Sequence, residues 1–458
     1  MRKKTTLAFI CLVSFLVPFM GSSINLSLPQ IGEAFSMKAV SLGWIATAYL
    51  ITTAIFQVPF ARLGDLIGRK RVFICGIAIF SIFTFLCGLA PSGSVLIVFR
   101  GLSGLGCAMM FGTNMAILTA VFPPQERGKV IGINTAVVYS ALASGPCIGG
   151  LLTHYWGWKS LFFLTGIFGF FVVAGSLLAL KGEWTESKGE KFDYAGSVIY
   201  AAGLFGLIFG FSRLPQAISF VSIGLGMAAF VLFVCYELKD RQPVFDVRIF
   251  SGNRVFGLSN LSSLINYACT YAVTYIMSLY LQYVRGFNAQ DAGMVLIVQA
   301  GVQCLVSLYA GRLSDRLNPA ALATAGMCVI VCGLCGLVFI AGDTPMMVVV
   351  VLLALLGVGF GLFSSPNATI IMGSVEKRFY GQASATMGTV RQVGQSFSMG
   401  IAMMATSLHL GNRLIVPELY PLLMKSFRTT FIVCAILCIA GAYTSAFRVK
   451  DAGRKCEN

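Results

Sequence analysis

Charge is concentrated in one ten-residue segment, RLGDLIGRKR at 62–71, which separates two long apolar stretches. Asp65 and Arg69 stand four residues apart, within reach of an ion pair, and Gly68 permits a tight turn. We expect Asp65 to begin the next helix, where the helix dipole and unpaired backbone N–H groups favour a carboxylate. Such a pair can hold two helices together in one conformation and release them in another. The alternative is that these charges only orient the chain, as we expect for Arg71.

A fainter copy of this segment, GRLSDRLN, occupies 311–318. It keeps Gly311 and Asp315, but Pro319 stands at the position that matches Arg69. We therefore expect any ion-pair latch at this second site to be weaker or to use other partners. The repetition itself indicates that the chain arose by duplication of one half.

Two arginines lie inside apolar runs, where a charged side chain costs at least ~2.5 kcal/mol at the centre of a membrane helix. Arg100 lies near one end of its run, so it either reaches out to the membrane surface or serves the interior of the protein. Arg391, in TVRQVGQSFS, lies near mid-run with Gln395 one turn away. We expect Arg391 to face a cavity, where it holds an anionic substrate group, a buried partner or water. The alternative is a fixed bridge to neighbouring carbonyls.

Other polar and aromatic residues recur at helical spacing and therefore share helix faces. Aromatic rings with scattered amides suit flat, largely apolar ligands, although helix packing is the alternative role for each residue alone. The residues that we expect to contact a substrate, besides Arg391, are Tyr49, Gln57, Tyr267, Tyr271, Gln299 and Gln303.

Composition shows which elements must position these residues. The chain has 458 residues, of which 57% are hydrophobic and 11% charged, with a mean hydropathy of +0.84. This excess of apolar residues requires a bilayer as the solvent. We predict an all-α polytopic membrane protein with fourteen spans, at 7–28, 42–61, 72–90, 94–121, 130–152, 160–180, 195–212, 217–236, 255–283, 292–311, 320–341, 345–372, 380–405 and 427–447.

The positive charges predict the orientation of these spans. With the N-terminus in the cytoplasm, cytoplasmic segments carry 24 of the Lys and Arg residues and external segments carry 7. An even number of spans then places both termini inside. We expect the basic start and the apolar run after it to be an uncleaved first helix. The net charge of +16 therefore reflects membrane topology, and we expect no nucleic-acid partner.

Two charged loops, 181–193 and 237–248, enclose the helix pair at 195–236. This pair looks inserted between two halves of six helices each, because the charged segment and its copy then follow the second span of each half. We predict an N-terminal bundle at 1–182, charged loops and the inserted pair at 183–248, a C-terminal bundle at 249–448, and a tail at 449–458.

Three segments match motifs of one family in order along the chain. The charged loop contributes Leu63, Asp65, Gly68, Arg69 and Lys70, the fourth span contributes Leu96, Arg100, Gly104, Gly106 and Ala108, and the fifth span contributes Gly145, Pro146, Gly149 and Gly150. Ala61, Ser103 and Ala141 depart from the motifs.

The chain resembles the fourteen-span drug:proton antiporters of the major facilitator superfamily over nearly its whole length. The resemblance implies two six-helix bundles, gating by the loop motif, a proton or electrostatic role for Arg100, and antiport for the fifth-span motif.

The first span departs from this family at one informative position. Asn25, Leu28 and Pro29 match the family's motif and add Asn25 to the candidate substrate residues, but Met20 replaces the usual Asp. All 17 Asp and Glu residues fall in predicted loops or at span edges. Proton coupling would then use Asp65, Asp315 or Glu33, or be absent. The loss of a buried carboxylate favours neutral or anionic substrates over cationic ones.

The sequence excludes several other classes of protein. It has no nucleophile–base pair, metal-ligand cluster or phosphate-binding loop, and its 14 cysteines lie mostly in apolar runs. We therefore expect neither an enzyme nor a primary pump, and neither a cofactor nor a metal. We expect a monomeric cell-membrane transporter that exports small amphipathic compounds, with protons as a candidate second substrate. The alternative is a proton-independent facilitator, or an exporter of one neutral or anionic metabolite.

Overall fold

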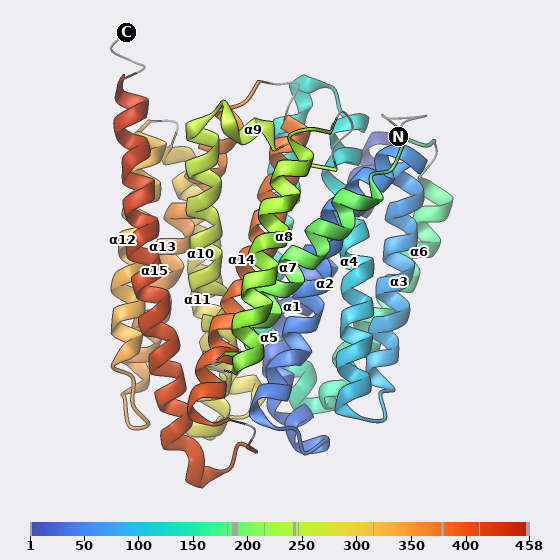
Figure 1. Cartoon of the computed structure of the whole chain (residues 1–458). Coiled ribbons are helices and arrows are strands. Elements are labelled where there is room, and N and C mark those ends of the chain that lie inside the picture. The colour runs from blue at the N-terminus through green and yellow to red at the C-terminus, as the bar shows by residue number, and fades with distance from the viewer. Residues whose placement is uncertain are drawn as a thin grey trace.

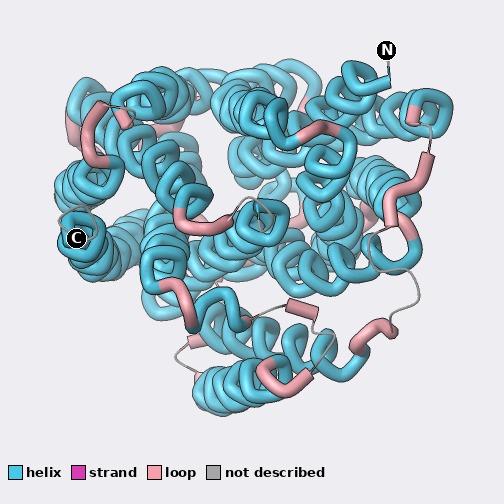
Figure 2. Tube along the Cα trace, turned by 90° about the horizontal axis from the view of Figure 1, so that it is seen from above, coloured by secondary structure: helices cyan, strands magenta, loops and turns pink. Residues whose placement is uncertain are grey.

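The computed structural model describes residues 2–180, 182–185, 191–214, 216–240, 244–245, 247–314, 316–376, 380–411 and 413–454. Within these residues the chain is helical and contains no strand (Figures 1 and 2). The long helices are α1 (Arg2–Ala34), α2 (Ala39–Ile67), α3 (Arg69–Gly88), α4 (Gly93–Val121), α5 (Pro124–Trp156), α6 (Trp158–Ala179), α7 (Tyr194–Arg213), α8 (Ala217–Glu237), α10 (Arg254–Leu279), α11 (Ala289–Leu313), α12 (Pro319–Val338), α13 (Met346–Gly373), α14 (Tyr380–His409) and α15 (Tyr420–Arg454). Short helical elements are α9 (Arg248–Ser251), a π-helical turn at Tyr280–Val284 that extends α10, and a 3₁₀ turn at Pro417–Leu419.

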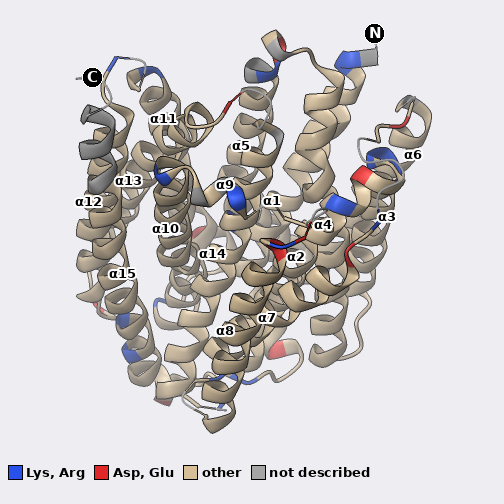
Figure 3. Ribbon diagram, turned by 45° about the horizontal axis from the view of Figure 1, so that its top comes forward, with Lys and Arg blue, Asp and Glu red and all other residues tan. Residues whose placement is uncertain are grey.

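Each of the fourteen predicted spans coincides with one long helix, which confirms the predicted all-α membrane fold. Thirteen of the helices are long and apolar enough to cross a membrane on composition alone. The exception is α14, which carries Arg391, Gln392 and Gln395 in its middle. A helix with this many polar groups crosses a membrane only when its neighbours cover them. In Figure 3 the ribbons of the long helices are largely uncharged along their length, with few Lys, Arg, Asp or Glu positions.

The helices pack as two groups of six. In the first, α1 packs on α5 and α6, α2 on α4, and α3 on α4 and α6. In the second, α10 packs on α14 and α15, α11 on α13, and α12 on α13 and α15. The equivalent neighbours in the two groups agree with duplication of one half. The exact boundaries of the halves stay a prediction.

The inserted pair, α7 and α8, crosses the front of the other helices in Figure 1 and lies at one edge of the assembly in Figure 2. The two helices pack tightly on each other, and α7 also contacts α2 of the first group and α14 of the second. The hydroxyl of Tyr200 on α7 donates to the carbonyl of Ala54 on α2 over 3.2 Å. The rings of Phe211 on α7 and Phe397 on α14 meet edge to face at 5.5 Å. The pair therefore touches both halves of the molecule.

Apolar side chains point outward as well as inward, as a protein dissolved in lipid requires. Phe171 and Leu178 on α6, Leu225 on α8 and Tyr309 on α11 are largely exposed at the outer surface. Both ends of the chain lie at the same end of the bundle (Figure 1). That arrangement agrees with an even number of spans; that this end faces the cytoplasm stays a prediction.

Candidate functional site

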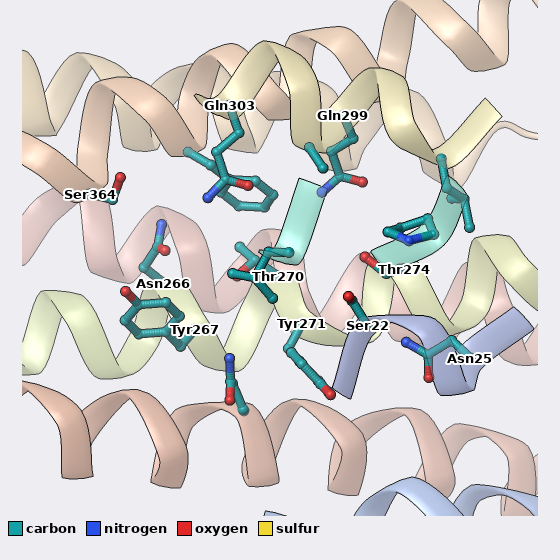
Figure 4. A pocket seen from close by; sticks show the side chains of 16 residues that line it. Ser22, Asn25, Asn266, Tyr267, Thr270, Tyr271, Thr274, Gln299, Gln303 and Ser364 are labelled. Carbon is teal, nitrogen blue, oxygen red and sulfur yellow. The ribbon is translucent and has the colours of Figure 1, made fainter. Parts of the chain in front are cut away.

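A cavity of about 100 Å³ lies between the two groups of helices. Figure 4 shows its polar wall, with side chains from α1, α10, α11 and α13 directed into one space. The lining residues are Ser22, Asn25, Leu142, Pro146, Asn266, Tyr267, Thr270, Tyr271, Thr274, Leu296, Gln299, Ala300, Gln303, Phe360, Ser364 and Gln395. Drug-sized ligands occupy pockets of about 300–1,000 Å³. A ligand of that size therefore requires the two groups to separate further.

Hydrogen bonds join the two groups of helices beside the cavity. The hydroxyl of Tyr271 on α10 donates to the carbonyl of Gly21 on α1 over 3.3 Å. Further along the same helices, two turns on in α10 and one turn on in α1, the hydroxyl of Ser278 donates to the backbone carbonyl of Asn25 over 2.7 Å. The side-chain oxygen of Asn25 itself has no hydrogen-bond partner in the described structure. This side-chain oxygen can therefore accept a hydrogen bond from a ligand in the cavity.

A second, smaller cavity of about 40 Å³ adjoins the first through their shared residues Leu142, Tyr271 and Gln395. Arg391 lines it, with the guanidinium carbon 5.5 Å from the centre of the Phe111 ring. Within the described part of the chain, Arg391 has neither a hydrogen bond nor an ion pair. Neither cavity is lined by a described Asp or Glu. The net charge offered to a ligand is therefore positive, which suits a carboxylate or another anionic group.

The structure brings together seven of the eight residues that we expected to contact a substrate. Five line the larger cavity, Tyr49 and Arg391 line the smaller one, and Tyr271 lines both. The exception is Gln57, which is buried and lines neither cavity. Its amide nitrogen would lie 3.0 Å from a Cβ built on Gly388 of α14. Gln57 therefore lies between α2 and α14, and its contact with a substrate stays a prediction. The five residues in the larger cavity are Asn25, Tyr267, Tyr271, Gln299 and Gln303.

Sequence reasoning did not select several residues of the wall. Gln395 was identifiable from its position one turn from Arg391, and Asn266 from the helical spacing that it shares with Thr270. Ser22 and Ser364 carried no signal, because serines are common on packed membrane helices. The hydroxyl of Ser364 is buried without a hydrogen-bond partner in the described structure.

Arg100 lies within the first group of helices and is only 1% exposed, so it does not reach the membrane surface. Its Nε donates to the carbonyl of Ile45 on α2 over 3.1 Å. Its guanidinium stacks on the ring of Tyr49 at 4.4 Å, a favourable cation–π distance. Arg100 thus joins α4 to α2 and holds in place a tyrosine of the smaller cavity. This arrangement supports an electrostatic and positioning role.

The two groups are closed against each other at the end of the bundle away from the termini. There α5 meets α11 so closely that a Cβ on Gly293 would collide with the carbonyl oxygen of Pro146. A Cβ on Gly150 would lie 2.5 Å from the carbonyl oxygen of Ala289. At the same end, the backbone N–H of Ala39 donates to the carbonyl of Arg413 over 2.9 Å. The fifth-span motif therefore forms part of the close contact between the two groups at this end, and its gating role stays a prediction.

The remaining motif residues of α5 pack within their own group. A Cβ on Gly145 would collide with Ser22 of α1, and a Cβ on Gly149 would lie 2.5 Å from Ser23. The hydroxyl of Ser23 donates to the carbonyl of Gly145 over 2.8 Å. These glycines let α5 lie directly against α1, which lines the cavity.

The charged segment forms an ion pair, but its position differs from the prediction. Asp65 lies in the last turn of α2 and not at the start of α3, which begins at Arg69 after Gly68 with φ of +121°. The helix simply continues through Gly64 for one more turn. Arg69 Nε and Asp65 Oδ1 are 2.7 Å apart, and Arg69 Nη1 donates to the carbonyl of Ala116 on α4 over 3.2 Å.

In this conformation the described bonds of the ion pair therefore stay within the first group. In the copy of the segment, Gly311 lies in α11 with a Cβ position 3.0 Å from the hydroxyl of Ser365. Asp315 lies outside the described residues, so its predicted role stays a prediction.

Glu183, which sequence reasoning did not select, covers the start of α3. Its Oε1 accepts a hydrogen bond from the backbone N–H of Lys70 over 2.8 Å, and its Oε2 is 3.5 Å from Nε of Arg71. The carbonyl of the next residue, Trp184, accepts from the backbone N–H of Arg69 over 3.0 Å. The loop that leads to the inserted pair is thereby attached to the charged segment, and an acidic residue caps the helix N-terminus.

Replacing Glu183 by Ala is expected to destabilise the protein by ~1 kcal/mol, because the start of α3 loses a charged cap. The decrease in melting temperature of the purified protein in detergent measures the effect. Asp343→Ala is the control, since the exposed carboxylate of Asp343 lies in the loop before α13 and exposed surface substitutions change stability little. Equal decreases in the two variants would contradict the capping role.

Comparison with known proteins places this geometry in a wider context. The sequence profile described as Major Facilitator Superfamily matches residues 10–399. The chain is 29% identical over 401 residues to the riboflavin transporter RibZ of Clostridioides difficile, covering 88% of this chain and 87% of RibZ. It is 29% identical over 384 residues to the multidrug resistance protein Stp of Mycobacterium tuberculosis, covering 82% and 71% of the two chains. A bacterial homologue of the human lysosomal transporter Spinster superposes with a TM-score of 0.72 at 16% identity, covering 98% and 97% of the two chains.

Proposed function

Because this chain belongs to the major facilitator superfamily, we propose that it exports small amphipathic compounds by alternating access. The observation that carries the proposal is a polar and aromatic cavity between two packed groups of helices, which meet in close backbone contacts at the end away from the termini. In secondary transporters the substrate binds at the interface of the two repeats, and one repeat rocks against the other. The name of the relative Stp, a multidrug resistance protein, supports drug export.

The distribution of Lys and Arg along the chain predicts which side of the membrane the closed end faces. With both termini in the cytoplasm, as the distribution of Lys and Arg predicts, the closed end is external. The conformation described here would then face the cytoplasm, ready to take up a compound for export. We propose that the halves that move are 1–182 and 249–448, with the protein acting as a monomer in the cell membrane.

A second candidate function is export of one neutral or anionic metabolite without protons. The unpaired Arg391 and the absence of a described acidic residue from both cavities favour it. A carboxylate in the cavity would attract cations and would offer a proton carrier beside the substrate. The name of RibZ, a riboflavin transporter, shows that relatives at this level of identity include transporters named for one compound.

Proton movement in inverted membrane vesicles distinguishes the two candidates. A pH-sensitive dye inside the vesicles reports proton release when drugs, organic anions or riboflavin are added. For a proton antiporter we expect a signal that is lost in Asp65→Asn and kept in Asp343→Asn, whose carboxylate is exposed in the loop before α13. Transport of a compound without any proton signal would support the second candidate. No transport of any compound would contradict both.

A further inference from the structure

Two carboxyl groups meet at one end of the inserted pair. Asp193 is the N-cap of α7, and Glu237 is the last residue of α8. Because α7 and α8 run antiparallel in close contact, the start of one helix lies beside the end of the other. A Cβ on Gly196 would collide with Asp193 Oδ2 and would lie 2.6 Å from Glu237 Oε1. These two oxygens therefore face the same point of the backbone.

Both of these oxygens lack a partner in the described structure, although the residues around them are well bonded. Glu237 is only 1% exposed, and neither its Oε1 nor Asp193 Oδ2 makes a hydrogen bond. The other oxygen of Asp193 accepts from the backbone N–H of Gly196 over 2.8 Å and from the hydroxyl of Tyr236 over 3.3 Å. Glu237 Oε2 accepts from the backbone N–H of Phe245 over 3.5 Å. Each carboxyl group therefore has one buried oxygen without a partner, Oδ2 in Asp193 and Oε1 in Glu237.

Among the residues that the structure describes, no cationic side chain forms an ion pair with Asp193 or Glu237. The carboxylate of Asp240 adds further negative charge. Arg248 donates to the carbonyls of Leu238 and Asp240, over 3.0 and 2.9 Å. Two carboxylates that share one buried site cannot both be ionised without a cation between them.

The positions of the two groups at helix ends favour a proton on Glu237 and a negative charge on Asp193. Asp193 lies at the N-terminus of α7, where backbone N–H groups and the helix dipole stabilise a negative charge. Glu237 lies at the C-terminus of α8, where the dipole opposes a negative charge, and burial opposes it as well. A proton on Glu237 Oε1 can then be donated to Asp193 Oδ2, which satisfies both unpartnered oxygens at once.

We propose that Asp193 and Glu237 form a proton-binding site in the inserted helix pair, separate from the central cavity. This site goes beyond the proposed transport function, because its occupancy does not require a transported substrate. Loss of the proton would place two negative charges side by side and push the end of α8 from the start of α7. Since α7 touches α2 and α14, and Glu237 holds the backbone at Phe245 on the way to α10, the change reaches both halves. The site thereby makes the transport rate depend on cytoplasmic pH, given the predicted topology.

Infrared difference spectroscopy of the purified full-length protein tests for this proton directly. As the pH is raised from 5 to 10 in choline chloride, the wild type should lose the carbonyl band of a protonated carboxyl. Glu237→Gln should lack that transition. Asp193→Asn should shift its midpoint down by ~1 pH unit or more, because a neighbouring negative charge is removed. Glu418→Gln, in which an exposed carboxylate beside α15 is replaced, should leave the transition unchanged.

Three results would overturn the site. The first is an identical titration of the wild type and Glu237→Gln. The second is an unchanged midpoint in a folded Asp193→Asn variant. The third is loss of the band at constant pH on addition of NaCl, which would show a sodium ion in place of the proton. None of these readings depends on a transported compound, so failure of the proposed export function leaves the test of the proton site intact.

The regulatory role has its own test in vesicles. The wild-type transport rate should change across the pH range of the infrared transition, and Glu237→Gln should transport at a rate that no longer changes there. A wild-type rate that is constant across that range, or an unaltered pH profile in Glu237→Gln, would overturn the regulatory role.

Discussion

Arg391→Gln is expected to lower the affinity of the protein for an aromatic carboxylate by ~10- to 100-fold. A hydrogen bond between a guanidinium and a carboxylate contributes ~1.5–3 kcal/mol, because both groups are charged and partly desolvated. The guanidinium of Arg391 has no competing partner in the described structure and lines a cavity that joins the larger one through Tyr271. Its charge is therefore available to a ligand.

Calorimetric titration with 2-naphthoate and with its neutral analogue, 2-naphthamide, measures this effect. The carboxylate should lose affinity in Arg391→Gln, and the amide should bind the variant and the wild type alike. Arg391→Lys should keep part of the preference, because the charge remains but the planar fork is lost. Arg285→Gln serves as the control, since Arg285 bonds to the carbonyl of Gly342 at an exposed site outside both cavities. An equal loss for both ligands would contradict a charge-selective role.

Gly293→Leu is expected to lower transport by at least ~10-fold, because α5 and α11 can no longer meet at the closed end. The carbonyl of Pro146 occupies the space that a side chain at residue 293 requires. Forcing additional atoms into a packed interface costs ~1–3 kcal/mol, and this cost falls only on the conformation in which the end is closed. The variant should therefore favour the conformation that is open at this end.

The native thiol of Cys147 reports on that change, because it lies 3.9 Å from the sulfur of Met294 in the same interface. Labelling of Cys147 by a maleimide, located by mass spectrometry, should be faster in Gly293→Leu than in the wild type. Gly301→Leu is the matched control on the same helix, since no atom lies within 4 Å of its Cβ position. Unchanged labelling in Gly293→Leu, or the same loss of transport in Gly301→Leu, would contradict the gate.

Hydropathy and charge predicted the positions of the helices because each depends on a short stretch of chain. The span at 380–405 was predicted correctly as well, although α14 is not among the thirteen helices that qualify on hydropathy alone. Helical spacing also identified much of the cavity wall, since Tyr267 and Tyr271 share a face of α10 wherever that helix packs. Spacing could not show which faces meet, and Gln57, on the face of α2 that it shares with Tyr49, proved to lie outside both cavities.

What the sequence could not show are the contacts between segments that lie far apart in it. Glu183 caps α3 from 113 residues away, and neither residue carries a pattern that predicts the contact. Asp193 and Glu237 stood in two loops that were identified only as charged, and only the packing of α7 on α8 brings them together. The burial of Arg100 likewise depends on the position of Tyr49 on another helix. Each of these features requires the tertiary structure.

Reconstitution of the purified protein into liposomes tests the central claim most directly, because no other transporter is then present. We would measure uptake of 2-naphthoate and 2-naphthamide, with and without an imposed pH gradient, for the wild type, Arg391→Gln and Gly293→Leu. We expect protein-dependent uptake of both compounds by the wild type, a selective loss of carboxylate uptake in Arg391→Gln, and loss of both in Gly293→Leu. If liposomes with the folded wild-type protein took up no more of either compound than empty liposomes, transport of small aromatic compounds through the central cavity would be contradicted.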